Sequence, residues 1–92
     1  MDKELKTIAD HYGLRTQMRQ LIEEMAELTQ VICKAERYDL DTVRDHLAEE
    51  IADVWIVLEQ VDYLLGDNEV QRIKAAKIER QKRRISDACG KV

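Results

Sequence analysis

Residues 16–37 read TQMRQLIEEMAELTQVICKAER, and this segment decides the fold. Its apolar side chains recur every three or four residues, which is the spacing of one face of an α-helix. The stripe consists of Met18, Leu21, Ile22, Met25, Leu28, Val31, Ile32 and Ala35. Gly13 precedes the segment and ends a shorter helix predicted at 2–12, because glycine is common just beyond a helix C-terminus.

A second long stripe runs through residues 41–65. Asp41 or Thr42 is its predicted N-cap, and Gly66 its predicted end. The stripe consists of Val43, Leu47, Ile51, Val54, Leu58, Val61 and Leu65. A fourth helix is predicted at 69–86, and residues 87–92 are expected to be frayed. Since the chain has 92 residues and no Pro, we predict one all-α, four-helix domain over 1–92.

Charge is unevenly distributed in this chain, whose formal net charge is −4. The acidic balance disfavours a nucleic-acid polymer as partner. Residues 72–84 are the exception, because they contain seven basic side chains and one acidic one. No apolar run is long enough to span a membrane, and the N-terminus lacks the apolar core of a signal peptide. We therefore expect a cytoplasmic protein with no membrane partner, in which Cys33 and Cys89 are free thiols.

Two acidic motifs interrupt the apolar stripes: EEMAEL at residues 23–28 and EEIADV at 49–54. Glu24 and Glu27 are three residues apart, as are Glu50 and Asp53, so each pair shares a helix face. If the two helices pack antiparallel, the four carboxylates converge. A divalent cation relieves their repulsion, and Mg²⁺ prefers oxygen ligands. The alternatives are solvated acidic faces or a di-iron site, but the latter favours a Glu-x-x-His motif that is absent here.

The pair of acidic motifs resembles the EExxE…ExxD signature of the MazG-like, all-α nucleoside triphosphate pyrophosphohydrolases. The similarity extends to Gln17, to Lys34 and to the basic segment KIERQKRRI at 77–85. It implies a helical bundle completed by dimerisation, as a homodimer or a dimer of dimers. The implied activity is Mg²⁺-dependent cleavage of a (d)NTP to a (d)NMP and pyrophosphate in nucleotide-pool housekeeping, with Mn²⁺ as a substitute cation.

The resemblance also implies roles for individual residues. The metal ligands would be Glu24, Glu27, Glu50 and Asp53. The catalytic group would be Glu23, Glu27 and Asp53, with Glu23 helping to orient the attacking water. The substrate would be held by Gln17, Lys34, Lys77 and Arg80.

One position departs from the family pattern: Ala75 stands where some members carry an Asn two residues before the Lys of the basic segment. A non-catalytic helical dimer that binds a nucleotide or a protein partner is therefore the main alternative to an enzyme. A coiled-coil interaction module is a third, although the acidic motifs interrupt its seam. Trp55, the single Trp, is expected in the core or at a dimer interface.

Overall fold

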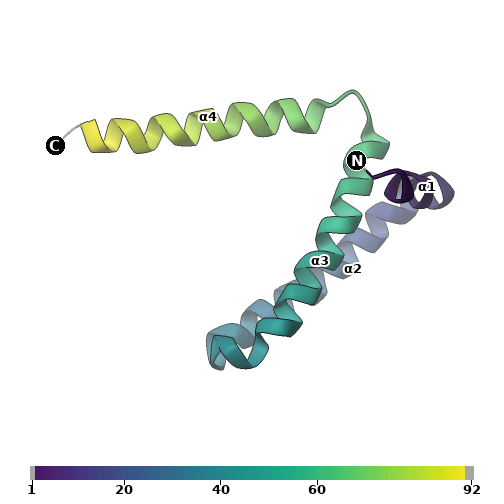
Figure 1. Ribbon diagram of the computed structural model, residues 1–92, viewed down its shortest axis with the longest axis horizontal. Coiled ribbons are helices and arrows are strands. Elements are labelled where there is room, and N and C mark those ends of the chain that lie inside the picture. Colours follow the sequence, from purple (N-terminus) through teal and green to yellow (C-terminus); the bar gives the residue numbers. More distant parts are fainter. Residues whose placement is uncertain (1, 91–92) are drawn as a thin grey trace.

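The computed structural model describes residues 2–90, and in this range it contains four α-helices and no strand (Figure 1). The helices are α1 (Lys3–Tyr12), α2 (Leu14–Arg37), α3 (Leu40–Leu65) and α4 (Glu69–Gly90). The all-α prediction is confirmed. Among the described residues, no helix has both the length and the apolar character needed to cross a membrane.

The ends of the helices differ from the prediction in three places. α2 begins at Leu14, directly after Gly13, whose φ of 83° suits a glycine. The N-cap of α3 is Asp39, whose side chain accepts a hydrogen bond from the backbone N–H of Asp41 at 3.4 Å. The prediction of Asp41 or Thr42 as this cap was therefore wrong. α4 continues to Gly90, so 87–90 are helical rather than frayed, and 91–92 lie outside the described residues.

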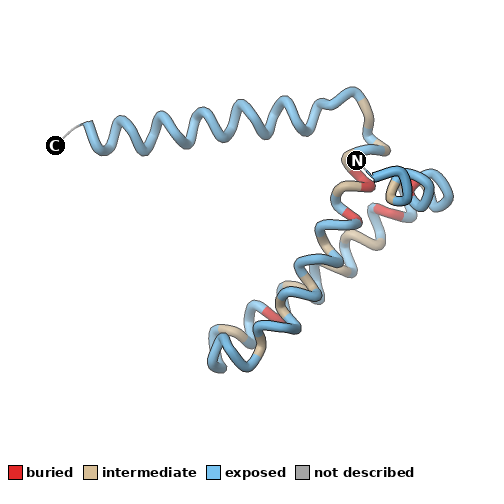
Figure 2. Tube along the Cα trace, in the orientation of Figure 1, coloured by how far each residue is buried: buried red, intermediate tan, exposed pale blue. Residues whose placement is uncertain are grey.

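α2 and α3 form an antiparallel hairpin, and α1 packs against one end of it (Figure 1). Only a thin core results: the buried apolar residues are Ala9, Val31, Val57 and Val61 (Figure 2). Two glutamines are buried beside them, and Gln17 Nε2 donates to Gln60 Oε1 at 2.6 Å across the hairpin. Gln60 Nε2 in turn donates to the carbonyl oxygen of Leu5, so this amide pair also attaches α1.

α4 extends away from the other three helices, and all of its described residues are exposed (Figures 1 and 2). The chain turns at Gly66, Asp67 and Asn68, whose φ angles are 80°, 61° and 54°. Asp and Asn adopt positive φ more readily than most residues, and Gly adopts it without penalty. Across this turn Gln71 Nε2 donates to Asp62 Oδ2 at 2.8 Å, which links the first turn of α4 to the last turn of α3.

The two apolar stripes predicted from the sequence are only partly buried within one chain. Val31 and Val61 are buried, and the stripe residues that are half-buried are Leu21, Leu28, Ala35, Val43, Leu47 and Val54. The rest are exposed, namely Met18, Ile22, Met25, Ile32, Ile51, Leu58 and Leu65. The hairpin therefore buries the centre of each stripe and leaves one flank without a partner.

Candidate metal centre

Three carboxylates meet across the hairpin, near the middle of α2 and α3. One ligand atom from each of Glu24, Glu27 and Glu50 lies within 4.8 Å of the others. The short connection at Tyr38–Asp39 causes this meeting, because it folds two helices of similar length back on one another. The two acidic motifs lie at similar distances from that connection and so come into register.

Glu24 and Glu50 each have one oxygen with a partner and one without. Glu24 Oε1 accepts a hydrogen bond from Gln20 Nε2 at 2.8 Å, and Glu50 Oε1 lies 3.3 Å from His46 Nε2. Glu24 Oε2 and Glu50 Oε2 are buried, and neither has a hydrogen-bond partner among the described residues. Leaving a charged acceptor buried and unpaired is costly, typically by about 1–3 kcal/mol or more. Both oxygens that lack a hydrogen-bond partner belong to the group of three carboxylates.

Glu27 is the exposed member of the group, and its pKa lies above the ordinary glutamate value. The main cause is the negative charge of Glu24, followed by that of Glu50. Partial desolvation adds to it, as does the hydrogen bond that Glu27 can donate to Glu50 when it is protonated. Either a proton or a cation relieves this repulsion. The group therefore has the electrostatics of a cation site.

Asp53 lies at the edge of this group rather than within it. Its charge is the smallest of the causes that raise the Glu27 pKa, and it is not one of the three carboxylates that converge within 4.8 Å. The sequence predicted four converging carboxylates, and the structure brings three together with the fourth nearby. The donors are carboxylate oxygens, which are the ligands that Mg²⁺ prefers. The side of the group formed by Glu27 is open to solvent.

Gln17 lies two helical turns before Glu24 on α2 and is buried. Its side chain is 5% exposed and is committed to Gln60 in the buried amide pair. Gln20, one turn later, is the glutamine that contacts Glu24. The sequence analysis did not single out Gln60; the only signal for it was a polar residue beside Val57 and Val61 in an apolar stretch.

Glu23 and Lys34 lie on the same flank of α2 as Glu27. Glu23 precedes Glu27 by four residues and Lys34 follows it by seven, and both spacings return to nearly the same side of a helix. All three side chains are exposed. Lys34 stands about 10 Å along the helix axis from Glu27.

Lys77 and Arg80 lie on α4, which extends away from α2 and α3 (Figure 1). Within one chain they are not brought to the carboxylates. Ala75 is also on α4 and is exposed. A site that combines the carboxylates with these basic residues therefore needs α4 from a second molecule.

No family model, no curated protein and no solved structure matches this chain. The site is thus defined by its own geometry and chemistry.

Proposed function

We propose that this chain is a Mg²⁺-dependent nucleoside triphosphate pyrophosphohydrolase of the MazG-like, all-α superfamily. It cleaves a (d)NTP to a (d)NMP and pyrophosphate, acts as a homodimer or a dimer of dimers, and serves nucleotide-pool housekeeping. One observation carries the proposal: Glu24 Oε2 and Glu50 Oε2 are both buried without a partner, inside a group of three carboxylates. A hard divalent cation held by these carboxylates would compensate their buried charge.

A cation explains this arrangement better than ordinary solvated acids do. Solvated acids keep their oxygens in contact with water, whereas one oxygen of each of these two glutamates is shielded from it. A buried ionised group that lacks a partner is normally neutralised or coordinates a metal. The donor set contains only carboxylates, which favours Mg²⁺ over metals that prefer imidazole or thiolate ligands.

The reaction is hydrolysis of the phosphoanhydride bond between the α- and β-phosphates. Water forms a bond to one of these two phosphorus atoms as the bond from that atom to the bridging oxygen breaks, which yields the (d)NMP and pyrophosphate. Mg²⁺, when bound, neutralises charge on the phosphoryl oxygens and lowers the pKa of a bound water. Glu24, Glu27 and Glu50 would hold the cation, with Asp53 beside them. Glu27, the exposed member of the group of three, would be placed to accept the proton of the attacking water.

The remaining assigned side chains act on the substrate. Glu23, exposed on the Glu27 flank, helps to orient the water. Lys34 on the same flank binds phosphate oxygens through its ammonium group. Lys77 and Arg80 stabilise the departing pyrophosphate and are supplied by α4 of a second copy, since α4 of the same chain extends away.

The test is pyrophosphate release from a panel of standard and modified (d)NTPs, with Mg²⁺, with Mn²⁺ and with EDTA. Glu50→Gln is measured beside Glu49→Gln, a matched control that removes the same charge one residue away from an exposed position outside the group of three. We expect release that requires the divalent cation, that disappears in Glu50→Gln, and that persists in Glu49→Gln.

One outcome would count against the proposed mechanism, and another would count against the enzyme. Release that continues in EDTA, or that survives Glu50→Gln, removes the carboxylates from the mechanism. Absence of release across the panel, combined with nucleotide binding, supports the alternative of a non-catalytic helical dimer. Ala75→Asn is then the first substitution to test, because it supplies the side-chain amide that some members of the resembled family carry at this position.

A further inference from the structure

Gln20 and His46 occupy equivalent places beside the two partly buried glutamates of the carboxylate group. Gln20 precedes Glu24 by four residues on α2, and its Nε2 donates to Glu24 Oε1 at 2.8 Å. His46 precedes Glu50 by four residues on α3, and its Nε2 lies 3.3 Å from Glu50 Oε1. In both glutamates Oε1 is held, while Oε2 is buried and has no partner among the described residues. The same arrangement therefore occurs twice, on two helices of different sequence.

The position four residues before an acid in these motifs decides what can hold its carboxylate. Side chains of an α-helix lean toward the N-terminus, so an acidic side chain lies over the residue one turn earlier. Glu27 and Asp53 follow Glu23 and Glu49 by four residues, and an ionised acid has no proton to donate. The two partly buried carboxylates thus have a donor at this position, whereas the two exposed ones have another acid.

A hydrogen bond to one oxygen fixes the orientation of a carboxylate. The terminal torsion of a free Glu side chain is broad, so its two oxygens exchange places and the group swings toward solvent. A donor at Oε1 restricts this torsion and keeps Oε2 in a defined place. For Glu24 and Glu50 the result is two unpaired oxygens on side chains whose ligand atoms, together with one from Glu27, lie within 4.8 Å of one another.

Both donors orient a carboxylate without requiring a positive charge. The amide of Gln20 is uncharged, and the imidazole of His46 can donate through Nε2–H in its neutral form. A Lys or Arg at either position would bring a full positive charge to the carboxylate and would compete with a cation for it. Gln20 is only half-buried and His46 is 51% exposed, so neither side chain belongs to the apolar core. The donors therefore preserve the negative charge that a cation needs.

We propose that Gln20 and His46 are positioning residues that make the carboxylate group selective for Mg²⁺. Each holds one glutamate by Oε1 and so fixes the place of Oε2, and this role rests on the cation site of the proposed function. Mg²⁺ requires nearly ideal octahedral geometry at short distances, whereas Ca²⁺ accepts longer and more variable ones. Loss of a positioning residue should therefore weaken Mg²⁺ binding more than Ca²⁺ binding.

Isothermal titration calorimetry with Mg²⁺ and with Ca²⁺, on the whole chain and without substrate, tests the role of Gln20. Gln20→Met keeps an unbranched side chain of similar length and removes the donor. Its matched control is Gln30→Met, the same change at an exposed position of α2. We expect Gln20→Met to weaken Mg²⁺ binding about 10–100-fold and Ca²⁺ binding less than about threefold. Gln30→Met should leave both dissociation constants within about twofold of the native values.

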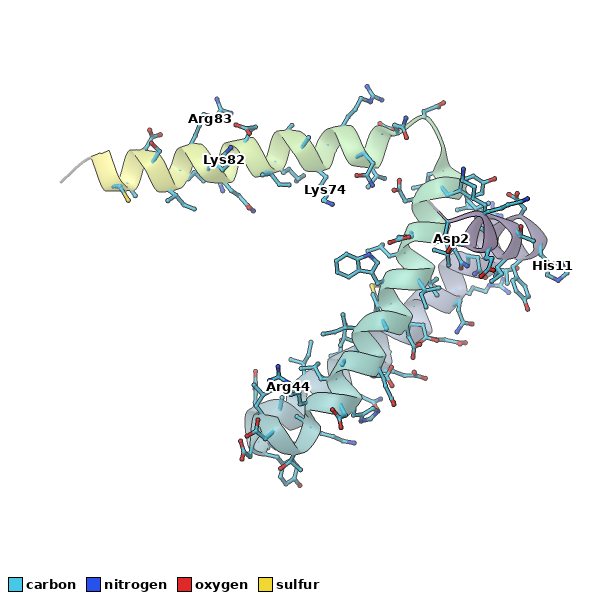
Figure 3. All side chains as sticks on the ribbon, viewed as in Figure 1. Asp2, His11, Arg44, Lys74, Lys82 and Arg83 are labelled. Carbon is cyan, nitrogen blue, oxygen red and sulfur yellow. The ribbon has the colours of Figure 1, made fainter. Side chains whose placement is uncertain are left out.

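The same titrations of His46 variants add a rescue that a merely structural residue would not show. His46→Phe keeps a planar ring and removes the donor. Its matched control is His11→Phe, because His11 lies on the outer side of α1 (Figure 3). His46→Gln restores an amide donor, the type of group that already holds Glu24 on α2. We expect His46→Phe to lose Mg²⁺ affinity as Gln20→Met does, and His46→Gln to stay within about threefold of the native Kd.

Three results would overturn the positioning role, and they separate it from the proposed function. Equal losses for Mg²⁺ and Ca²⁺ would mean that the two side chains act through charge or stability rather than orientation. Unchanged Mg²⁺ affinity in either variant that lacks the donor would mean that helix packing alone places the carboxylates. In both cases the native chain still binds Mg²⁺, and the proposed function stands. A native chain that binds no Mg²⁺ removes the cation site itself, and the positioning role with it. Circular dichroism in EDTA verifies that each variant keeps its helices.

Discussion

Glu50→Gln is expected to stabilise this protein in the absence of Mg²⁺ and to remove its stabilisation by Mg²⁺. Glu50 Oε2 is buried without a partner, and Glu24 and Glu27 lie close to it. An amide at position 50 carries no charge, and its NH₂ group can donate to Glu24 Oε2, the other orphaned oxygen. One substitution therefore removes one unpaired charge and can satisfy another acceptor.

The size of the effect follows from burial and from the number of groups involved. The Glu50 side chain is 12% exposed, so solvent screens it only in part. A buried charged acceptor without a partner costs about 1–3 kcal/mol. Loss of the contact with His46, which is 51% exposed, subtracts at most about 1 kcal/mol. We expect a net gain of about 1–2 kcal/mol, which raises Tm by about 4–15 °C in a domain of this size.

Mg²⁺ is expected to make the native chain more stable than Glu50→Gln, which reverses the order expected in EDTA. A cation that binds only the folded protein stabilises it by about 2.7 kcal/mol at a hundred times its Kd. The native chain should gain this amount, whereas Glu50→Gln has lost one of three ligands and should gain little. Differential scanning calorimetry in EDTA and across a Mg²⁺ titration measures both quantities, at one chain concentration because dimerisation makes Tm concentration-dependent.

Two results would refute this reasoning. A lower Tm for Glu50→Gln in EDTA means that the carboxylate stabilises the fold, for example through His46. An equal Mg²⁺ shift in the native chain and the variant means that the cation binds elsewhere. Glu49→Gln is the control in both cases, since it removes an exposed carboxylate from the neighbouring position and should leave Tm and its Mg²⁺ shift almost unchanged.

Three further predictions concern the amide pair and the exposed flank of α2. Gln60→Ala should lower the unfolding free energy by about 3 kcal/mol in urea denaturation, because it leaves a cavity and an unpaired Gln17, whereas replacing both by Leu should cost much less. Glu27 binds its proton more tightly when folded, so its contribution to stability is present in acid and is lost as pH rises through its raised pKa. Glu27→Gln should therefore raise Tm at neutral pH without Mg²⁺, and the gain should disappear in acid; a gain that is constant with pH contradicts the assigned repulsion. Lys34→Ala should lower kcat/KM about tenfold without changing Tm or its Mg²⁺ shift; unchanged kinetics would remove Lys34 from the substrate site.

The helices and the main features of the carboxylate group could be predicted from the sequence, because both depend on local spacing. Periodicity places α2 and α3, and Gly13 and Gly66 mark helix ends through their positive φ angles. Glu24, Glu27 and Glu50 converge as expected because a short connection and similar helix lengths leave little freedom of register. The cap at Asp39 was missed because Asp39, Asp41 and Thr42 are all good cap residues within four positions.

The environment of each side chain was less predictable, because it depends on contacts distant in sequence. Gln17 fitted the pattern of a substrate ligand, yet 43 residues further along the chain Gln60 supplies an amide that pairs with it. The apolar stripes were predicted as one face of each long helix, and about half of their residues are exposed within one chain. Spacing shows that a face is apolar, but it does not show whether the same chain or another one covers it.

Lys77 combines a proposed role in substrate binding with a position on an apolar face of α4. As a substrate ligand it must reach the carboxylates of a second copy. As a neighbour of Val70, Ile73 and Ile78 on α4, it also lies on an apolar face that is exposed within one chain and that the proposed dimer can cover. A lysine can serve both purposes, because its methylene stem packs on apolar surface while its ammonium group extends to the edge of the interface.

Lys77→Met separates these roles, because it keeps an unbranched apolar stem and removes the charge. If Lys77 binds the departing pyrophosphate, kcat/KM should fall at least tenfold while the dimer persists with an equal or lower Kd in sedimentation equilibrium. If Lys77 only packs in the interface, the dimer should tighten and kcat/KM should stay unchanged, which would remove Lys77 from the substrate site. A dimer that dissociates on this substitution would contradict both assignments, since it would mean that the ammonium group makes an essential ion pair within the interface.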